Sequence, residues 1–190
     1  MLRLVVATAN PGKAAEITAV LGPAVELVPR PEDVPEPVED AGTLEGNARI
    51  KATALCEATG LPAVADDTGL EVDALGGAPG VETAHFKAGT PFEHGWQRLL
   101  HELGDRTHRT ARFRTVALCR FPDGREVVAE GTCPGTIALA PAGAGGFGYD
   151  PVFAPAEGDG RTFAQMSADE KHAVSHRGRA FRSLAEALAR

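Results

Sequence analysis

Apolar residues along this chain fall into two kinds of stretch, short runs and longer segments with helical spacing. Residues 2–7 and 25–28 are mostly apolar runs, which are typical of buried strands. In residues 12–21 and 43–59 apolar positions recur every three or four residues, which predicts a helix in each. Gly60 follows the second segment and is a typical residue to end a helix. The first third of the chain therefore predicts strands and helices in alternation.

The rest of the chain adds a hairpin and two further helices. Residues 112–121 and 126–133 alternate between apolar and polar side chains, and the turn signal Pro122-Asp123-Gly124 separates them. Helical spacing returns in residues 91–103 and 181–188. Strand–helix alternation followed by a hairpin predicts an α/β fold with a mixed sheet.

Length, charge and cysteine content narrow the class of protein. A chain of 190 residues can bury a sizeable core, and we expect residues 1–190 to form a single domain. The net charge of −7 argues against a general nucleic-acid binder, because such proteins usually carry a basic surface. No apolar run is long enough to span a membrane. The three cysteines are odd in number and widely separated, so we expect reduced thiols in a cytoplasmic protein.

A polar turn follows the first predicted strand, at the point where the first helix begins. It reads Thr8-Ala9-Asn10-Pro11-Gly12-Lys13. Amides at a helix N-terminus attract an anion, and Lys13 adds a mobile cation. The turn lacks the spacing of a Walker P-loop. Taken alone, it fits an ordinary strand-to-helix turn capped by Asn10 equally well.

Two adjacent carboxylates form the second candidate feature. Residues 63–65 predict a short strand that ends at Asp66 and Asp67, which we place in a loop, and Glu39 lies in an acidic segment upstream. Hard carboxylate ligands suit Mg²⁺, which shares phosphate oxygens with its substrate. A carboxylate beside such a metal can also deprotonate a water molecule. The alternative is a solvated acidic turn, which is the commoner reason for an isolated Asp-Asp pair.

A glycine-rich loop forms the third feature. Residues 143–148 match the spacing G-x-G-x-x-G, but Pro151 follows closely and breaks the helix that a dinucleotide fingerprint requires. We interpret the glycines as positions where the backbone approaches a base, with Phe147 or Tyr149 as the stacking surface. A flexible glycine turn is the alternative.

Cationic side chains gather near the end of the sequence. Lys171, His176 and Arg177 are candidate contacts for phosphate or base. His172 and His176 are four residues apart, but no third ligand has a spacing that suits zinc.

These strings together match one family. The chain resembles the inosine/xanthosine triphosphate pyrophosphatases, which remove non-standard purine nucleotides. The matching strings occur in the family's order over nearly the whole chain, at residues 8–13, 47–52, 65–70, 75–80, 145–151, 170–171 and 175–178.

The resemblance implies an elongated mixed sheet in two lobes with flanking helices and an active-site cleft between the lobes. It also implies a homodimer and Mg²⁺ as cofactor. Asp67 would be the proton acceptor and a metal ligand, with Glu39 as the other metal carboxylate. The residues that would hold the phosphates are Thr8, Ala9, Asn10, Pro11, Gly12, Lys13 and Lys51. Those that would hold the rest of the nucleotide are Thr68, Phe147, Gly148, Tyr149, Asp150, Lys171, His176 and Arg177.

Three departures from the family pattern stand near these residues. Gly46 replaces the usual Glu before Asn47, and Gly95 replaces a usual Asn. Residues 82–86 replace a segment that is usually Tyr-Ser-Ala-Arg-Tyr, so that an Arg is lost and a carboxylate is gained.

The expected reaction is hydrolysis of ITP, dITP or XTP to the monophosphate and pyrophosphate. One alternative is a related pyrophosphatase that acts on pyrimidine or modified nucleotides. Another is a nucleotide sensor without turnover, which Gly46 and His85 suggest and which Asp67, Lys13 and Lys51 argue against.

Overall fold

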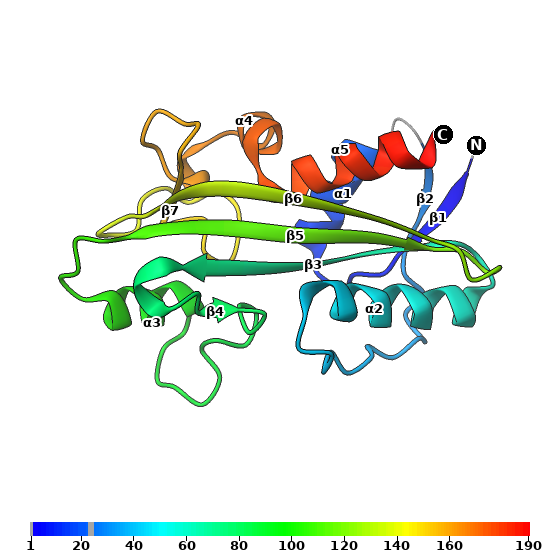
Figure 1. Cartoon of the computed structure of the whole chain (residues 1–190), viewed down its shortest axis with the longest axis horizontal. Helices are drawn as coiled ribbons and strands as arrows, with labels where there is room; N and C mark the ends of the chain where they lie inside the picture. The colour runs from blue at the N-terminus through cyan, green and yellow to red at the C-terminus, as the bar shows by residue number, and fades with distance from the viewer. Residues whose placement is uncertain (1, 23–24) are drawn as a thin grey trace. The chain divides into compact units, whose positions relative to one another are not determined.

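The computed structural model describes residues 2–22 and 25–190, and these residues form a mixed α/β fold (Figure 1). Its strands are β1 (Arg3–Val6), β2 (Glu26–Val28), β3 (Ala63–Val72), β4 (Pro79–Gly80), β5 (Thr110–Arg120), β6 (Glu126–Ile137) and β7 (Phe153–Pro155). Its α-helices are α1 (Pro11–Leu21), α2 (Leu44–Thr59), α3 (Gly95–Leu103), α4 (Ala168–Val174) and α5 (His176–Leu188). Two short 3₁₀ helices, Asp73–Leu75 and Phe163–Gln165, complete the described elements.

The strands form a mixed sheet, as the sequence predicts. In the part of the chain that the structure describes, the sheet has the order β2-β1-β3-β5-β6-β7, with β4 paired to β3. β1 runs parallel to both β2 and β3, whereas β4 is antiparallel to β3 and β7 is antiparallel to β6. The parallel pairs follow from the strand–helix alternation of the first third of the chain, because a parallel pair needs a crossover connection.

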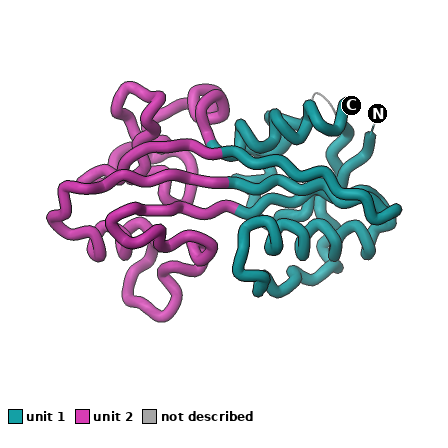
Figure 2. The backbone as a smooth tube through the Cα atoms, in the orientation of Figure 1, with its two compact units in different colours: residues 1–67, 115–131, 176–190 teal, residues 68–114, 132–175 magenta. Residues whose placement is uncertain are grey.

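The chain divides into two compact units, coloured separately in Figure 2. Unit 1 contains residues 1–67, 115–131 and 176–190, and unit 2 contains residues 68–114 and 132–175. The long strands β3, β5 and β6 each contribute residues to both units.

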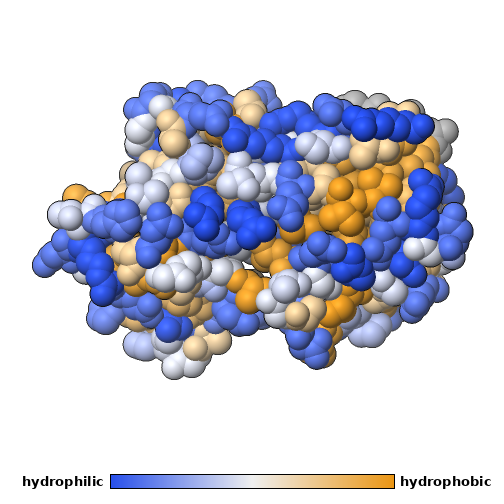
Figure 3. All heavy atoms as spheres, viewed as in Figure 1, coloured by the Kyte–Doolittle hydropathy of each residue, from blue (hydrophilic) through white to orange (hydrophobic). Residues whose placement is uncertain are grey.

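Unit 1 has helices on both faces of its strands. Figure 1 shows α1 and α5 on one face and α2 on the other. Its main core cluster joins β1, α1, β5 and α5, with Leu4, Ile17, Ala117 and Phe181 fully buried. On the face drawn in Figure 3, hydrophobic residues gather within the part that belongs to unit 1.

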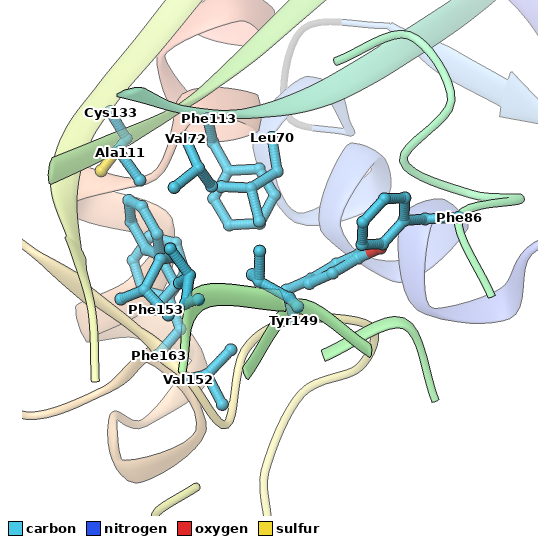
Figure 4. Close-up of a cluster of buried hydrophobic side chains, with 13 residues drawn as sticks. Leu70, Val72, Phe86, Ala111, Phe113, Cys133, Tyr149, Val152, Phe153 and Phe163 are labelled. Carbon is cyan, nitrogen blue, oxygen red and sulfur yellow. The ribbon is translucent and has the colours of Figure 1, made fainter. Parts of the chain in front are cut away.

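Unit 2 is built around an aromatic core, drawn in Figure 4. The ring of Phe113 meets that of Phe153 edge-on at 4.7 Å between centroids, and Phe153 lies 5.1 Å from Phe163. Such edge-on pairs are the favoured geometry of aromatic rings. Tyr149, from the glycine-rich loop, belongs to the same cluster.

Most predicted elements are present, with shifted ends. The helix predicted over residues 91–103 begins only at Gly95, and the one predicted over 181–188 begins earlier, at His176. The clearest error concerns the strand predicted over 63–65, which continues as β3 to Val72. Gly22-Pro23 in the sequence also predicts the end of the first helix, and Pro23 lies outside the described residues. No helix among the described residues is both long and apolar enough to cross a membrane.

Candidate active site

Asp66 and Asp67 lie within β3 and not in a loop as predicted. Successive side chains of a strand point to opposite faces, so the two carboxylates point to different helices. Asp66 contacts Lys13 and Arg177, from α1 and α5 on one face. Asp67 contacts α2 on the other face. The strand therefore gives two chemically identical neighbours separate environments.

The polar turn after β1 forms the capped N-terminus of α1. Asn10 caps α1, its side-chain oxygen accepting from the amide of Lys13 at 3.2 Å, and Pro11 occupies the first helical position. The hydroxyl of Thr8 accepts from the amide of Asn10 at 3.2 Å. Caps of this kind fix the direction of the helix and leave its first turn electropositive. Lys13 stands in that first turn with its side chain 20% exposed.

Helix α2 holds both oxygens of Asp67. Asn47 and Lys51 are four residues apart and so share one face of the helix. The Asn47 amide donates to Oδ2 of Asp67 at 3.1 Å, and the Lys51 ammonium lies 3.4 Å from Oδ1. Asn47 also accepts from the amide of Ala41 at 3.1 Å, which ties the preceding loop to the helix. That loop brings Glu39 to within 2.7 Å of Lys51.

The environments move the pKa values of the two carboxyl groups in opposite directions. Burial would raise the pKa of Asp66, but Lys13 and Arg177 outweigh it and hold the pKa well below its usual range. Burial raises the pKa of Asp67, and the opposing charges of Lys51 and Lys13 do not fully offset it. Neighbouring carboxyl groups whose pKa values are pushed apart are a mark of acid–base assignment. Of the two carboxylates, Asp67 is accordingly the stronger base.

Arg177, a predicted contact for phosphate or base, is bonded to two carboxylates. Its side chain is 3% exposed, and its guanidinium donates from Nε to Oδ2 of Asp66 at 3.2 Å and from Nη1 to Glu16. Glu16 is a buried carboxylate on α1. These two donor groups are thus committed to carboxylates within unit 1.

A pocket of about 700 Å³ adjoins the polar turn and includes Thr8 and Ala9 in its lining. The rest of its lining comes from β1, α1, β2 and the proline-rich segment 29–36, and it is mainly apolar. Asp66 and Asp67 do not line it. We therefore place the chemistry at the carboxylates of β3, where charges converge, and not in the apolar pocket.

Unit 2 contains a second group of predicted site residues. Lys171 is buried and its ammonium donates to Oδ2 of Asp150 at 2.6 Å. The same oxygen accepts from the amide of Phe147 at 2.8 Å. The Lys171 ammonium lies 4.8 Å from the centre of the Phe147 ring, within the range of a cation–π contact. A Cβ at Gly146 would overlap the carboxylate of Asp150, so glycine there lets Asp150 fold back onto its own loop.

The structure distinguishes the two candidate stacking rings. Tyr149 is buried, and its hydroxyl donates to the carbonyl of Thr83 at 3.0 Å, so this ring is part of the core. Phe147 is only partly buried. Thr68 is also partly buried, Gly148 is exposed, and His176 is buried at the start of α5. Of the two rings, Phe147 is the one with exposed area on which a base could stack.

The donor set around Asp67 suits a hard divalent cation. Glu39 and Asp67 both contact the ammonium of Lys51, at 2.7 and 3.4 Å, so the two carboxylates lie close to one another. Among the described residues no cluster of three or more His, Cys, Asp or Glu side chains forms a metal cage. Mg²⁺ is usually held by one or two carboxylates together with water and substrate phosphates, so the residues present fit it.

Two of the departures have a steric explanation. A Cβ at Gly46 would overlap the Ala41 methyl group and lie 2.8 Å from the Thr43 hydroxyl, so the loop that carries Glu39 packs closely on α2. A Cβ at Gly95 would overlap the hydroxyl of Tyr149. A larger residue at either position requires a different local packing.

Comparison with known proteins identifies the family. The model of the Ham1 family matches residues 4–187, nearly the whole chain. The chain belongs to the Ham1 family. It is 48% identical to the dITP/XTP pyrophosphatase of Streptomyces avermitilis, over 97% of this chain and 96% of that protein. A Ham1 protein of Coxiella burnetii has a solved structure that matches with a TM-score of 0.87 and 35% identity, covering 100% of this chain and 99% of that one.

A solved Mycobacterium abscessus structure, named nucleoside-triphosphatase / dITP/XTP pyrophosphatase, matches at 43% identity with a TM-score of 0.73 over the full length of both chains. These matches confirm the predicted family and α/β fold.

Two polar residues that contact candidate site residues were not among those predicted. Asn47 lies within a matching string, and its spacing of four from Lys51 on a helix was the signal that could have assigned it a role. Glu16 carried no comparable signal, because its partner Arg177 is 161 residues away in the sequence.

Proposed function

We propose that this Ham1-family chain hydrolyses non-standard purine nucleoside triphosphates, namely ITP, dITP and XTP, to the monophosphate and pyrophosphate. Its relatives, which are named dITP/XTP pyrophosphatases, support this substrate class. The observation that carries the chemistry is Asp67, a carboxylate with a raised pKa held between an amide and an ammonium group. A general base is most effective when its pKa is brought nearer to the working pH.

In the proposed reaction a water oxygen attacks the α-phosphorus and the bond from that phosphorus to the bridging oxygen breaks. Asp67 accepts the proton of the water. Lys13, Lys51 and the electropositive N-terminus of α1 hold the phosphates and stabilise the charge that develops on the leaving pyrophosphate. Asn47 keeps the Asp67 carboxylate oriented while the proton moves.

We propose Mg²⁺ as the cofactor, held by Glu39 and Asp67. When bound, it supplies charge neutralisation at the phosphate oxygens. The carboxylate pair that converges on Lys51 supports this assignment.

For the base we propose a stacking site on Phe147. A purine with a carbonyl at C6 accepts hydrogen bonds there, whereas adenine presents an amino group that leaves a donor unpaired. Lys171 offers only donors, and the glycine-rich loop offers backbone amides, so both favour a carbonyl. The proposed nucleotide-binding set also includes Thr68, Gly148, Tyr149, Asp150, His176 and Arg177.

The test is pyrophosphate release from ITP, dITP, XTP, GTP, ATP and CTP, with and without Mg²⁺. We expect kcat/KM for ITP and XTP to exceed that for ATP by at least about a hundredfold, as expected when a buried polar group is left unpaired. Equal kcat/KM for ATP and ITP would leave only a general nucleotide pyrophosphatase. Preference for CTP would favour the pyrimidine alternative, and release of orthophosphate alone would reject the reaction.

We also propose a cytoplasmic homodimer. The resemblance supports the dimer, and the absence of disulfides among the described cysteines, which are all buried, supports a reducing compartment. Light scattering of the purified chain tests the dimer.

A further inference from the structure

Helix α2 carries two side chains that each contact both the loop before the helix and strand β3. The ammonium of Lys51 lies 2.7 Å from Glu39 of the loop and 3.4 Å from Oδ1 of Asp67. Asn47, one turn earlier, accepts from the backbone amide of Ala41 and donates to Oδ2 of Asp67, both at 3.1 Å. The loop and the strand are therefore joined by two bridges, one charged and one neutral.

The two partners of Asn47 fix the orientation of its side-chain amide. A backbone N–H only donates and an ionised carboxylate only accepts, so the oxygen must face Ala41 and the nitrogen must face Asp67. The opposite orientation would bring oxygen against carboxylate and N–H against N–H. Asn47 is 4% exposed, and breaking either bond would leave a buried polar group without its partner. The neutral bridge thus has a single favourable arrangement.

The charged bridge is weakened when substrate and metal bind as proposed. Lys51 then contacts the phosphates, and its ammonium group is repelled by a divalent cation held at Glu39 and Asp67. The two carboxylates also repel each other once the ammonium group no longer lies between them. The two bonds of Asn47, in contrast, involve neither the phosphates nor the Glu39 side chain. The neutral bridge therefore remains when the charged bridge opens.

We propose that Asn47 is a positioning residue for the metal carboxylates, because it holds the loop that carries Glu39 against Asp67. The proposal rests on the proposed function in one respect, that Glu39 and Asp67 hold Mg²⁺. In this role Asn47 contacts neither the metal nor the nucleotide. It keeps the two carboxylates prearranged, so that metal binding does not have to order the loop.

The test is the affinity of the nucleotide-free protein for Mn²⁺, which takes the same oxygen ligands as Mg²⁺ and whose free form is measured by electron paramagnetic resonance. Asn47→Leu keeps the approximate size of the side chain and removes both hydrogen bonds. We expect the dissociation constant of Mn²⁺ to rise about tenfold, the order of a lost hydrogen bond to a charged group. Circular dichroism verifies that the variant is folded.

Thr59→Val is the matched control on the same helix. The Thr59 hydroxyl also joins α2 to a loop, because it donates to the carbonyl of Leu55 at 2.6 Å and accepts from the amide of Leu61 at 3.3 Å. Valine keeps the shape of the side chain and removes both bonds, about three helical turns from Asn47. It should leave the Mn²⁺ affinity unchanged. An equal loss in both variants would show that any weakened contact of α2 lowers metal affinity, and would overturn the proposal.

A double-mutant cycle with Glu39→Gln tests whether the loop is involved. If Asn47 acts by placing Glu39, then Asn47→Leu should lower the Mn²⁺ affinity less when residue 39 is already neutral. Equal losses in both backgrounds would overturn the proposal, because Asn47 would then act on Asp67 alone. Unchanged Mn²⁺ affinity in a folded Asn47→Leu protein would overturn it as well.

If Asn47→Leu does not fold, Asn47→Ser takes its place. Serine is too short to reach both partners, so a loss of Mn²⁺ affinity in the same direction is expected, and an affinity equal to that of the wild type would overturn the proposal. Failure of the wild-type protein to bind Mn²⁺, or an unchanged affinity in Glu39→Gln, would count against the proposed metal site instead.

Discussion

Asp66 and Asp67 show how two identical neighbours take different roles. The alternation of β3 gives Asp66 two cationic partners in a fully buried position and gives Asp67 one ammonium and one amide. The first carboxylate therefore remains ionised, whereas the second has a raised pKa and can accept a proton.

Asp67→Asn tests this division of roles. The amide cannot accept the proton of the attacking water, so we expect kcat to fall at least about a hundredfold, the lower range for removal of an acid–base group. Steady-state release of pyrophosphate from ITP measures it, with circular dichroism to verify folding. Asp73→Asn, at an acidic residue that pairs with Arg112 in unit 2, is the matched control and should keep near-normal turnover. Normal turnover in folded Asp67→Asn would remove Asp67 from the mechanism.

Among single residues, those that stand in short sequence motifs can be singled out as candidates from the sequence alone. Lys13, Lys51 and Asp67 stand in recognisable strings, and the structure brings Lys51 to Asp67 and Lys13 to the neighbouring Asp66. The pairing of Glu16 with Arg177 could not be predicted in the same way. It depends on α1 and α5 packing on one face of the sheet, which is a property of the tertiary fold.

Strand β3 shows why polar residues mislead the prediction of elements. Residues 66 and 67 read as the start of a loop because two adjacent carboxylates are rare inside a buried strand. Cations and an amide from α1, α2 and α5 satisfy them, so the strand continues through them to Val72. The sequence pattern predicts a loop where the structure has a strand, and such disagreements are expected at a candidate site.

The substitution Gly46→Ala tests how closely the preceding loop packs on the first turn of α2. In most helix interiors Gly→Ala stabilises by about 1 kcal/mol. Here the new methyl group would overlap that of Ala41, so the loop that carries Glu39 must move. We expect Gly46→Ala to give no gain in unfolding free energy and to lower kcat/KM. The double variant Ala41→Gly/Gly46→Ala removes the opposing methyl group and should restore kcat/KM; failure to do so would mean that the overlap with Ala41 is not the cause.

The start of α4 provides a prediction about pH. The Arg161 guanidinium and the amide of Ser167 hold the pKa of Glu170 at about 2, against an ordinary value of 4.5. Because the folded-state pKa is depressed, this contact stabilises the fold fully above the ordinary value and is lost as the pH falls towards 2. The group is exposed, so its effect on stability is small and screened by salt.

The titration of Glu170 itself is therefore the measurement of choice, by NMR of its side-chain carboxyl. Arg161→Gln should raise the pKa towards the ordinary value, and salt at about 1 M should raise it part of the way. A pKa that is insensitive to both changes would show that Arg161 does not hold Glu170 in solution.

At the scale of the whole molecule, the pattern of apolar residues predicts the class of fold but not its division into units. The alternation of strands and helices and the later hairpin give the mixed α/β sheet. The division depends on two separate core clusters, one around Leu4 and Phe181 and one around Phe113 and Phe153. No linker in the sequence marks the boundary between the units, because β3, β5 and β6 each have residues in both. The cleft that the resemblance implies stays a prediction.

Shared strands have a consequence for unfolding. If either unit unfolded alone, β3, β5 and β6 would each have to stay ordered in one part and unfold in the other within a single strand. We therefore expect one cooperative transition for the whole chain. Phe153→Leu, in the core of unit 2, should destabilise by on the order of 1–3 kcal/mol and lower the protection of Leu4–Val6 in unit 1 by the same amount. Hydrogen exchange followed by mass spectrometry measures both regions in one experiment. Loss of protection confined to unit 2 would show that the units unfold independently despite their common strands.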